Sequence, residues 1–307
     1  MIQIERQIAI RARGPFSWTA ALDVLAHWAP MRRYRPAGSP VVHLAFPLDG
    51  DFAPVAVALR DDGGMLRGEV VGTNDLDRVA AQVARIFSLD HDATAYPAVG
   101  ERDPAVGRLM AALPGLRPVC FTSPYETAAW AVLSARTSQA HAAMLLDRLL
   151  ADQGHPLVVA ALEVRAFPEP ERLLRLRAGQ GVSVEKVARL HSVARAALDG
   201  LLDSDRLRGL GDDAGPTSMR TIRGIGDSWS QRIYLRGCGV RDVFPAEPLS
   251  IAALGHLHRL GHRPRPDAVR ELTDRYRPFR MWVSFLLRVA VNRGLIPGVA
   301  GREGAQA

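Results

Sequence analysis

The chain has 307 residues, of which 48% are hydrophobic and 23% are charged, and it carries a formal net charge of +7. This length allows two or three modest domains with cores of their own, and the composition excludes a disordered or fibrous protein. No apolar run is long enough to span a membrane, and the first residues lack the basic and apolar regions of a signal peptide. We therefore expect a cytoplasmic protein with no membrane association.

The positive charge comes almost entirely from arginine, because Lys186 is the only lysine in the sequence. Arginine suits phosphate binding, since its guanidinium group is planar and permanently charged. A GC-rich genome that encodes arginine wherever lysine would serve explains the same composition. The charge therefore supports nucleic-acid binding without requiring it.

Neither the cysteines nor the histidines are spaced like metal ligands. Cys120 and Cys238 lie far apart in the sequence, and we expect both to be buried thiols in a reducing compartment. His256, His258 and His262 are close in sequence, but no acidic residue lies at ligand spacing from them. These side chains therefore predict no metal site.

The first residues show a strand signal and then a helix signal. Isoleucines in residues 2–10 alternate with mostly polar neighbours, which predicts a half-buried strand. Ser17 can cap a helix whose apolar residues, from Trp18 to Trp28, fall at helical spacing.

Three β-like runs follow at 41–48, 52–60 and 65–71, separated by Asp-Gly and Gly-Gly turn signals. Asn74 or Asp75 then opens a helix with one apolar face. Together with the first strand, these runs predict a small α+β domain built on an antiparallel sheet.

From about residue 103 to residue 293 every strong hydrophobic period is helical. The segments with this period are 125–136, 137–150, 171–176, 184–202, 218–223, 228–235, 249–260, 266–276 and 279–292. The sequence thus predicts an α+β N-terminal domain followed by an all-α bundle. We place the N-terminal domain at 1–112, a helical domain at 113–230, a C-terminal helical subdomain at 231–300 and a flexible tail at 301–307.

A tight turn between two of these helices reads Arg223-Gly224-Ile225-Gly226. The glycines permit positive φ and close backbone approach, while Ile225 can anchor the turn in the core. The next helix begins directly after the turn, so its free N–H groups would point at a bound phosphate without reading a base. An ordinary C-cap glycine followed by an N-cap Asp227 explains the same residues, and that carboxylate repels an anion unless it turns inward.

A lone acid follows about twenty residues later, in the segment D-V-F-P-A-E-P at 242–248. Proline is favoured at the first position of a helix, which puts Glu247 at the N-cap of the helix that begins with Pro248. A carboxylate there can face a cationic transition state, such as the oxocarbenium ion formed when an N-glycosidic bond breaks, or can position the attacking water. The alternative is a charge that only complements the helix dipole.

In order and spacing, these features resemble the helix-hairpin-helix DNA glycosylases, and most of all the bacterial alkylpurine (3-methyladenine) DNA glycosylase II branch. The resemblance covers nearly the whole chain. The stretches that carry it, besides the turn and the acid, are G-P-F-S-W at 14–18, R-I-F-S-L-D at 85–90, L-P-G-L-R-P at 113–118, S-P-Y-E-T-A-A-W-A-V-L-S at 123–134, F-P-E-P-E-R-L at 167–173 and the helix at 186–200.

The resemblance implies an enzyme of base excision repair that flips a damaged base out of duplex DNA and hydrolyses its glycosidic bond with an aspartate. Relatives that also cut the strand carry a lysine just after the hairpin; Ser228 and its neighbours supply no amine, so we expect a monofunctional glycosylase. The family's four-cysteine iron–sulfur loop is absent as well. The expected partner is double-stranded DNA with damaged bases, bound by a nucleoid-associated monomer that needs no organic cofactor and holds at most a monovalent cation at the hairpin.

The catalytic position departs from the family. Gapless alignment matches the family's catalytic aspartate with Pro248, and Glu247 precedes it by one residue. Either a one-residue shift gives Glu247 the catalytic role, or the catalytic acid is lost. The first alternative predicts release of alkylated purines, and the second predicts a protein that binds damaged or distorted DNA without cutting it.

The resemblance also implies DNA-binding and base-pocket residues. Arg136, at a junction between two helices, falls near the family's wedge position, although an exposed surface arginine explains it equally well. The position that often carries an aromatic residue against the flipped base aligns near Arg288, and Trp282 is equally a core residue of an amphipathic helix. The expected phosphate-binding residues are Arg223, Gly224, Ile225, Gly226 and Ser228, and the expected pocket residues are Tyr125, Trp229, Arg232, Trp282 and Arg288.

Overall fold

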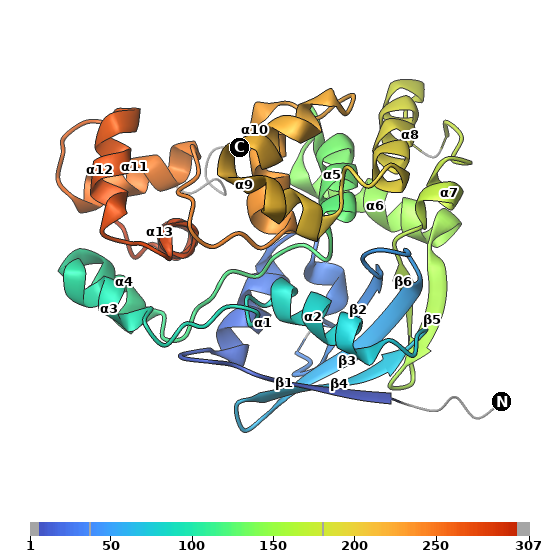
Figure 1. The fold of residues 1–307 in the computed structure, drawn as a ribbon, viewed down its shortest axis with the longest axis horizontal. Helices are drawn as coiled ribbons and strands as arrows, with labels where there is room; N and C mark the ends of the chain where they lie inside the picture. Colours follow the sequence, from blue (N-terminus) through green and yellow to red (C-terminus); the bar gives the residue numbers. More distant parts are fainter. Residues whose placement is uncertain (1–5, 37, 180, 300–307) are drawn as a thin grey trace. The chain divides into compact units, whose positions relative to one another are not determined.

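The computed structural model describes residues 6–36, 38–179 and 181–299, which fall into two compact units. The first unit is formed by Met1–Arg11, Leu22–Asp90 and Val119–Gly239. The second is formed by Ala12–Ala21, His91–Pro118 and Val240–Ala307. Each unit therefore combines segments that are far apart in the sequence (Figure 1).

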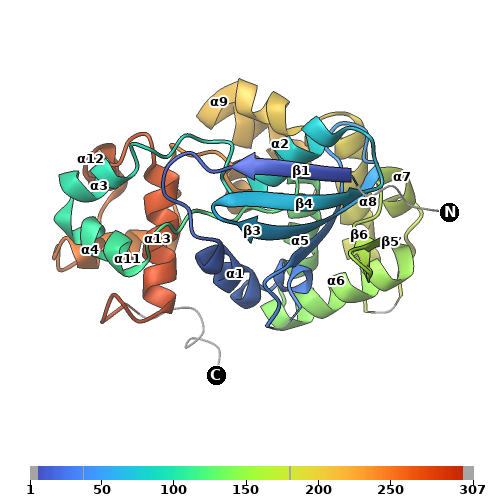
Figure 2. The same ribbon diagram turned by 90° about the horizontal axis from the view of Figure 1, so that it is seen from below.

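A four-stranded antiparallel sheet is the centre of the first unit, as the sequence predicts. Its strands, in spatial order, are β1 (Arg6–Arg11), β4 (Met65–Val71), β3 (Pro54–Asp62) and β2 (Val42–Pro47). Figure 2 shows β1, β4 and β3 side by side. The predicted Gly-Gly turn joins β3 to β4, and both Gly63 and Gly64 have positive φ. Ile2 and Ile4 of the expected first strand lie outside the described residues.

Two helices also begin where the sequence predicts. The hydroxyl of Ser17 accepts a hydrogen bond from the amide of Ala20 in α1 (Trp18–His27). Asp75 caps α2 (Leu76–Ile86) by accepting a hydrogen bond from the amide of Arg78. The helix α2 packs against β1.

A β-hairpin corrects the expectation that everything after residue 112 is helical. Strands β5 (His155–Val159) and β6 (Leu162–Ala166) pair in antiparallel fashion, and β6 packs against β2. The turn between them has Ala160 and Ala161 at φ values of 48° and 61°, where glycine or asparagine is usual. Because its turn carries none of the usual signals, the hairpin is not detectable from local sequence.

The remaining elements of the first unit are helical. They are α5 (Pro124–Ser134), α6 (Gln139–Gln153), α7 (Pro170–Leu173), α8 (Val184–Leu198), α9 (Ser204–Ser218), the 3₁₀ turn η2 (Met219–Thr221), α10 (Asp227–Arg232) and the π-helical turn η3 (Ile233–Gly237). The hydrophobic pattern does not reveal α9, and it predicts a helix at 218–223, where the chain forms only the short turn η2. Cys120 and Cys238 are buried free thiols, as expected.

The second unit is built from α3 (Pro97–Arg102), α4 (Pro104–Ala112), α11 (Pro248–Leu257), α12 (Pro266–Asp274) and α13 (Arg280–Asn292). The helix α11 packs against α13, and α13 packs against α4. The predicted tail at 301–307 lies outside the described residues. None of the described helices combines the length and apolar character needed to cross a membrane.

Candidate functional site

The hairpin forms a tight turn with an apolar anchor. The amide of Ile225 donates a 3.0 Å hydrogen bond to the carbonyl of Ile222, and both side chains are 4% exposed. Arg223 lies exposed on the outside of the turn. Among the described residues, the amides of Gly224 and Gly226 have no hydrogen-bond acceptor, so both are available to an anion.

The two glycines of the hairpin have different reasons to be there. Gly224 has a φ of +96°, which disfavours any side chain, and a Cβ atom there would lie 2.9 Å from the Cδ atom of Arg189. Gly226 has an extended backbone with a φ of −95°, and a Cβ atom there would meet no atom within 4 Å. The space around position 226 does not require glycine. Glycine is favoured at an N-cap, which is where position 226 lies, and the close approach of a ligand would favour it further.

The helix α10 begins at Asp227, directly after the turn, with Gly226 as its N-cap. The Asp227 carboxylate does not cap the helix; it pairs with the Nε atom of Arg220 at 2.9 Å. Its charge is thus compensated, which removes the objection that it would repel an anion. Ser228 is exposed at the same end of the helix.

Two predicted pocket residues lie side by side on α10. Trp229 is half-buried, and the guanidinium carbon of Arg232 lies 5.3 Å from the centre of its ring. This cation–π contact stiffens both side chains. The electron-rich face of the Trp229 ring is thus in contact with a cation of the protein itself.

Arg136 follows α5 in a strained conformation. Its φ is +56°, which few residues other than glycine, asparagine and aspartate adopt, and its side chain is exposed. No carboxylate among the described residues forms an ion pair with it. Strain of this kind is concentrated at functional sites.

Lys186 lies against the end of α5. Its ammonium group donates a hydrogen bond to the carbonyl oxygen of Leu133, three residues before Arg136. Burial, and then the charge of Arg189, hold the pKa of Lys186 below its ordinary value. The side-chain amine of Lys186, the one lysine of the sequence, is therefore bound to a backbone carbonyl group.

Tyr125, another predicted pocket residue, lies in the core of the first unit. Its side chain is 1% exposed, and its hydroxyl donates a 3.0 Å hydrogen bond to the carbonyl of Pro168. Its ring makes edge contacts with Phe52 and Phe167. Burial raises the pKa of Tyr125 well above its ordinary value. In this conformation the residue supports α5 and offers no face to a ligand.

Glu247 lies at the N-cap of α11, where the Glu-Pro dipeptide predicts it. Its carboxylate makes no capping hydrogen bond; instead Oε1 lies 2.9 Å from Nη1 of Arg288, and Oε2 accepts a 3.3 Å hydrogen bond from Ser250. The side chains of Glu247 and Arg288 are 14% and 28% exposed. A carboxylate that only complemented the helix dipole would point at the first amides of α11, which this one does not do.

Two serines connect the helices that carry this ion pair. The hydroxyl of Ser284 on α13 donates a 2.9 Å hydrogen bond to the hydroxyl of Ser250 on α11, and both residues are buried. Sequence reasoning missed both serines. The spacing of Ser250 three residues after Glu247 is a usable signal on a helix, whereas nothing in the sequence points to Ser284.

Asp242, the other acid of the segment 242–248, forms ion pairs with two arginines. Asp242 pairs with Arg277 at 3.0 Å and with Arg280 at 2.8 Å. These bonds connect the start of the segment to α13 and to the residues before it. Asp242 is thus a structural carboxylate, and Glu247 is the remaining candidate in the segment.

Trp282 and its neighbours form the aromatic core of the second unit. The ring is 2% exposed and lies about as far from Tyr96 as from Phe279, at 5.1 Å between ring centres. The guanidinium carbon of Arg117 lies 5.3 Å from its centre. The structure therefore agrees with the alternative in which Trp282 is a core residue.

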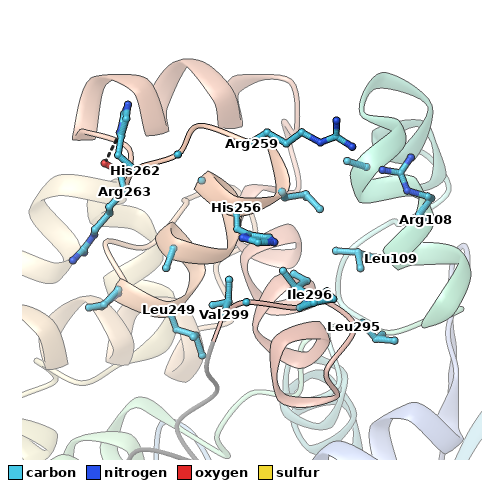
Figure 3. Close-up of a pocket in the computed structure, with 18 of the residues that line it drawn as sticks. Arg108, Leu109, Leu249, His256, Arg259, His262, Arg263, Leu295, Ile296 and Val299 are labelled. Carbon is cyan, nitrogen blue, oxygen red and sulfur yellow. Dashed lines mark hydrogen bonds between the residues drawn. The ribbon is translucent and has the colours of Figure 1, made fainter.

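The second unit contains a cavity of about 1340 Å³ (Figure 3). Glu247 is one of its lining residues. The apolar lining of the cavity includes Leu109, Leu249 and Ile296, and its polar lining includes His256, His262, Arg108, Arg259 and Arg263. In the view of Figure 3, His256 lies in the middle, with Arg108 and Arg259 on one side and His262 and Arg263 on the other. None of these three arginines forms an ion pair with a described residue, so the cavity is electropositive. Through it, solvent reaches the edge of the Glu247 site.

The described residues contain no group of three or more His, Cys, Asp or Glu side chains arranged to hold a metal ion. Glu247 offers the chemistry of a carboxylate beside a guanidinium. The chemistry available at the hairpin is that of backbone amides and arginines.

Comparison with known proteins gives relatives of one kind. The chain is 29% identical to DNA-3-methyladenine glycosylase 2 of Escherichia coli over 229 residues, which are 73% of this chain and 77% of that protein. It is 28% identical over 219 residues to a probable bifunctional transcriptional activator/DNA repair enzyme AlkA of Mycobacterium tuberculosis, of which it spans only 42%. No protein-family model matches the chain.

Solved structures share the fold at lower identity. The 3-methyladenine DNA-glycosylase of Archaeoglobus fulgidus superposes with a TM-score of 0.74 at 20% identity, over 94% of this chain and 99% of that one. The 8-oxoguanine glycosylase/lyase of Clostridium acetobutylicum, in complex with DNA, has a TM-score of 0.69 at 15% identity, over 96% and 99%. With the hairpin, the sheet and the order of elements described above, these similarities show that the chain belongs to the helix-hairpin-helix DNA glycosylase superfamily.

Proposed function

We propose that the protein is a monofunctional DNA glycosylase that hydrolyses the N-glycosidic bond of alkylated purines in duplex DNA. The observation that carries this proposal is the placement of Glu247: a carboxylate 14% exposed, at the start of a ten-residue helix, beside an electropositive cavity. The names of the relatives from Escherichia coli and Archaeoglobus fulgidus support the same reaction class.

The hairpin holds the DNA backbone in this proposal. The free amides of Gly224 and Gly226 donate hydrogen bonds to one phosphate, and the exposed guanidinium of Arg223 adds a charge. None of these groups reads a base, so the hairpin fixes position and leaves selection to the pocket. A monovalent cation fits the hairpin as well, because the carbonyl oxygens of Gly224 and Ile225 accept no hydrogen bond from the described residues. Such a cation would add positive charge near the phosphate.

Arg136 fills the gap left by a flipped nucleotide. Its exposed, unpaired side chain and its strained backbone suit a residue that is held in position to enter the duplex. Flipping a damaged base costs less than flipping a paired one, since the damaged pair is already weakened.

Glu247 then acts on the flipped nucleotide. As the bond between C1′ and the base nitrogen breaks, the carboxylate stabilises the positive charge that develops on the sugar and orients the attacking water. Strand cleavage through a Schiff base does not follow. The amine of Lys186 is bound to the carbonyl of Leu133, and Lys186 lies on α8, far in sequence from the residues that follow the hairpin.

The test is release of methylated purines from alkylated duplex DNA by the wild type and by Glu247→Gln, with melting temperature as the folding control. We expect release by the wild type and a loss of roughly 100-fold or more in the variant, as for removal of an electrostatic stabiliser. Equal release by both proteins would exclude Glu247 as the catalytic acid.

A second function is favoured by the ion pair itself. The guanidinium of Arg288, 2.9 Å from the carboxylate, compensates the charge that the transition state needs. If Glu247 stays bound to Arg288 throughout, the protein recognises damaged DNA and does not excise a base. In that case wild type and Glu247→Gln bind damaged duplexes alike, and neither releases a base.

A further inference from the structure

We propose that Arg288 is a second catalytic residue, which assists departure of the base and makes the enzyme select damaged bases that carry no positive charge. The inference rests on the proposed role of Glu247 and goes beyond it in naming a second group and a narrower substrate class.

Arg288 is close enough to Glu247 to touch the same substrate. The two side chains meet at 2.9 Å, and the hydrogen bond between Ser250 of α11 and Ser284 of α13 connects the two helices nearby. A sugar carbon in contact with the carboxylate thus has the guanidinium as a neighbour, and the departing nitrogen is one bond away from that carbon. The remaining N–H groups of Arg288 have no acceptor among the described residues and are free to donate to a ligand.

The pair changes which leaving group is favoured. An isolated carboxylate attracts a cationic base, whereas a carboxylate neutralised by a guanidinium attracts it far less, and the guanidinium repels it at short range. An uncharged base gains from the same arrangement, because the N–H groups of Arg288 donate hydrogen bonds to its ring nitrogen or carbonyl oxygen.

The chemistry of departure points the same way. When the glycosidic bond breaks, its electron pair goes to the base nitrogen. A cationic alkylated purine then leaves as a neutral molecule and needs no assistance. An uncharged base leaves with a negative charge, which hydrogen bonds from Arg288 stabilise.

The step is balanced by one water molecule. The water oxygen bonds to C1′ as the base nitrogen leaves, one water hydrogen stays on the new sugar hydroxyl, and the other proton reaches the base through solvent. Arginine cannot act as the acid, because its guanidinium group does not lose its proton in proteins. Arg288 therefore stabilises the departing base, and Glu247 stabilises the sugar.

The test compares release of a charged base, 7-methylguanine, with release of an uncharged one, 1,N6-ethenoadenine, from duplexes of the same flanking sequence under single-turnover conditions. We expect the wild type to release the uncharged base faster. In Arg288→Gln, release of the uncharged base should fall by roughly 100-fold, while release of 7-methylguanine should be unchanged or faster. Arg288→Lys, which keeps the charge and loses the planar fork, should restore part of the preference.

Arg280→Gln is the matched control. Arg280 is on the same helix and pairs with Asp242 at 2.8 Å, so its loss removes an ion pair of the same unit without removing a group proposed to touch the substrate. The ratio of the two release rates should not change in this variant, even if its melting temperature falls.

Faster release of 7-methylguanine by the wild type, or an equal loss of both activities in Arg288→Gln, would overturn the role of Arg288 and leave the proposed glycosylase activity intact. Release of neither base by a folded wild-type protein that binds both duplexes would contradict the glycosylase activity and, with it, this inference.

Discussion

Substitution of Gly226 by alanine should separate DNA binding from folding. The position has an ordinary extended backbone, and the added methyl group would meet no atom of the protein within 4 Å. Replacing glycine where the new residue fits without strain restricts the unfolded chain and stabilises proteins by about 0.4–1 kcal/mol. Glycine is, however, favoured over alanine at an N-cap, which is where position 226 lies. The two effects offset each other, so we expect Gly226→Ala to be about as stable as the wild type.

The same methyl group should weaken DNA binding. It would stand at the surface from which the amides of Gly224 and Gly226 reach a phosphate. Losing one hydrogen bond to a charged group costs about 1.5–3 kcal/mol, which is roughly a tenfold to hundredfold increase in Kd.

Urea unfolding and fluorescence anisotropy with a labelled duplex at several salt concentrations measure the two effects. Gly209→Ala is the control, since Gly209 is exposed inside α9, has no positive φ and faces open space. It should stabilise the protein without changing Kd. Unchanged affinity in Gly226→Ala would refute the argument that the close approach of a ligand favours this glycine.

Two further changes test strain and pH. Arg136→Gly relieves a φ of +56°, worth roughly 1–2 kcal/mol, but it also frees the unfolded chain, at a cost of about 0.4–1 kcal/mol. The variant should therefore be slightly more stable than the wild type and yet release the base more slowly. Ala160→Gly, at a φ of 48°, should be slightly stabilised without slower release, and equal rates for the wild type and Arg136→Gly would remove Arg136 from the site. Burial lowers the pKa of His43 and outweighs the opposite effect of Glu69. Its neutral form is therefore favoured in the folded state, so the free energy of unfolding should decrease as pH falls below about 6.5. His43→Gln should lose less stability than the wild type between pH 7.5 and pH 5.5 in urea, and parallel losses would count against this assignment.

The elements that the sequence predicts well are those with strong local signals. The turn with Gly63 and Gly64, both at positive φ, separates two strands with the right period, and Ser17 and Asp75 cap the helices expected after them. In each case local backbone chemistry and burial favour the same structure. These segments are predictable because the local backbone preference and the burial pattern indicate the same structure.

The elements that the sequence misses are those in which tertiary contacts override local preference. The β5–β6 hairpin turns at two alanines with positive φ and is stabilised by packing of Val159 and Ala166 in a cluster with residues of the main sheet. The helix α9 contains Pro216 and a kink at Gly211, where φ is 81°, and its composition argues against a helix. Each compact unit is also assembled from distant segments, which no local pattern reveals.

The candidate site shows the same division between local and long-range information. The N-cap position of Glu247 follows from one dipeptide, because proline begins helices and the residue before it must cap them. What the carboxylate does there depends on Arg288, 41 residues later, and that partner is fixed only by the packing of α11 on α13. In the sequence, Glu247 next to the expected catalytic position and Arg288 near the expected aromatic position are two separate departures from the family. In the structure, the two residues form one ion pair. Any change at one of them alters the charge of the other's surroundings, so the electrostatics of this site depend on the pair and not on the acid alone.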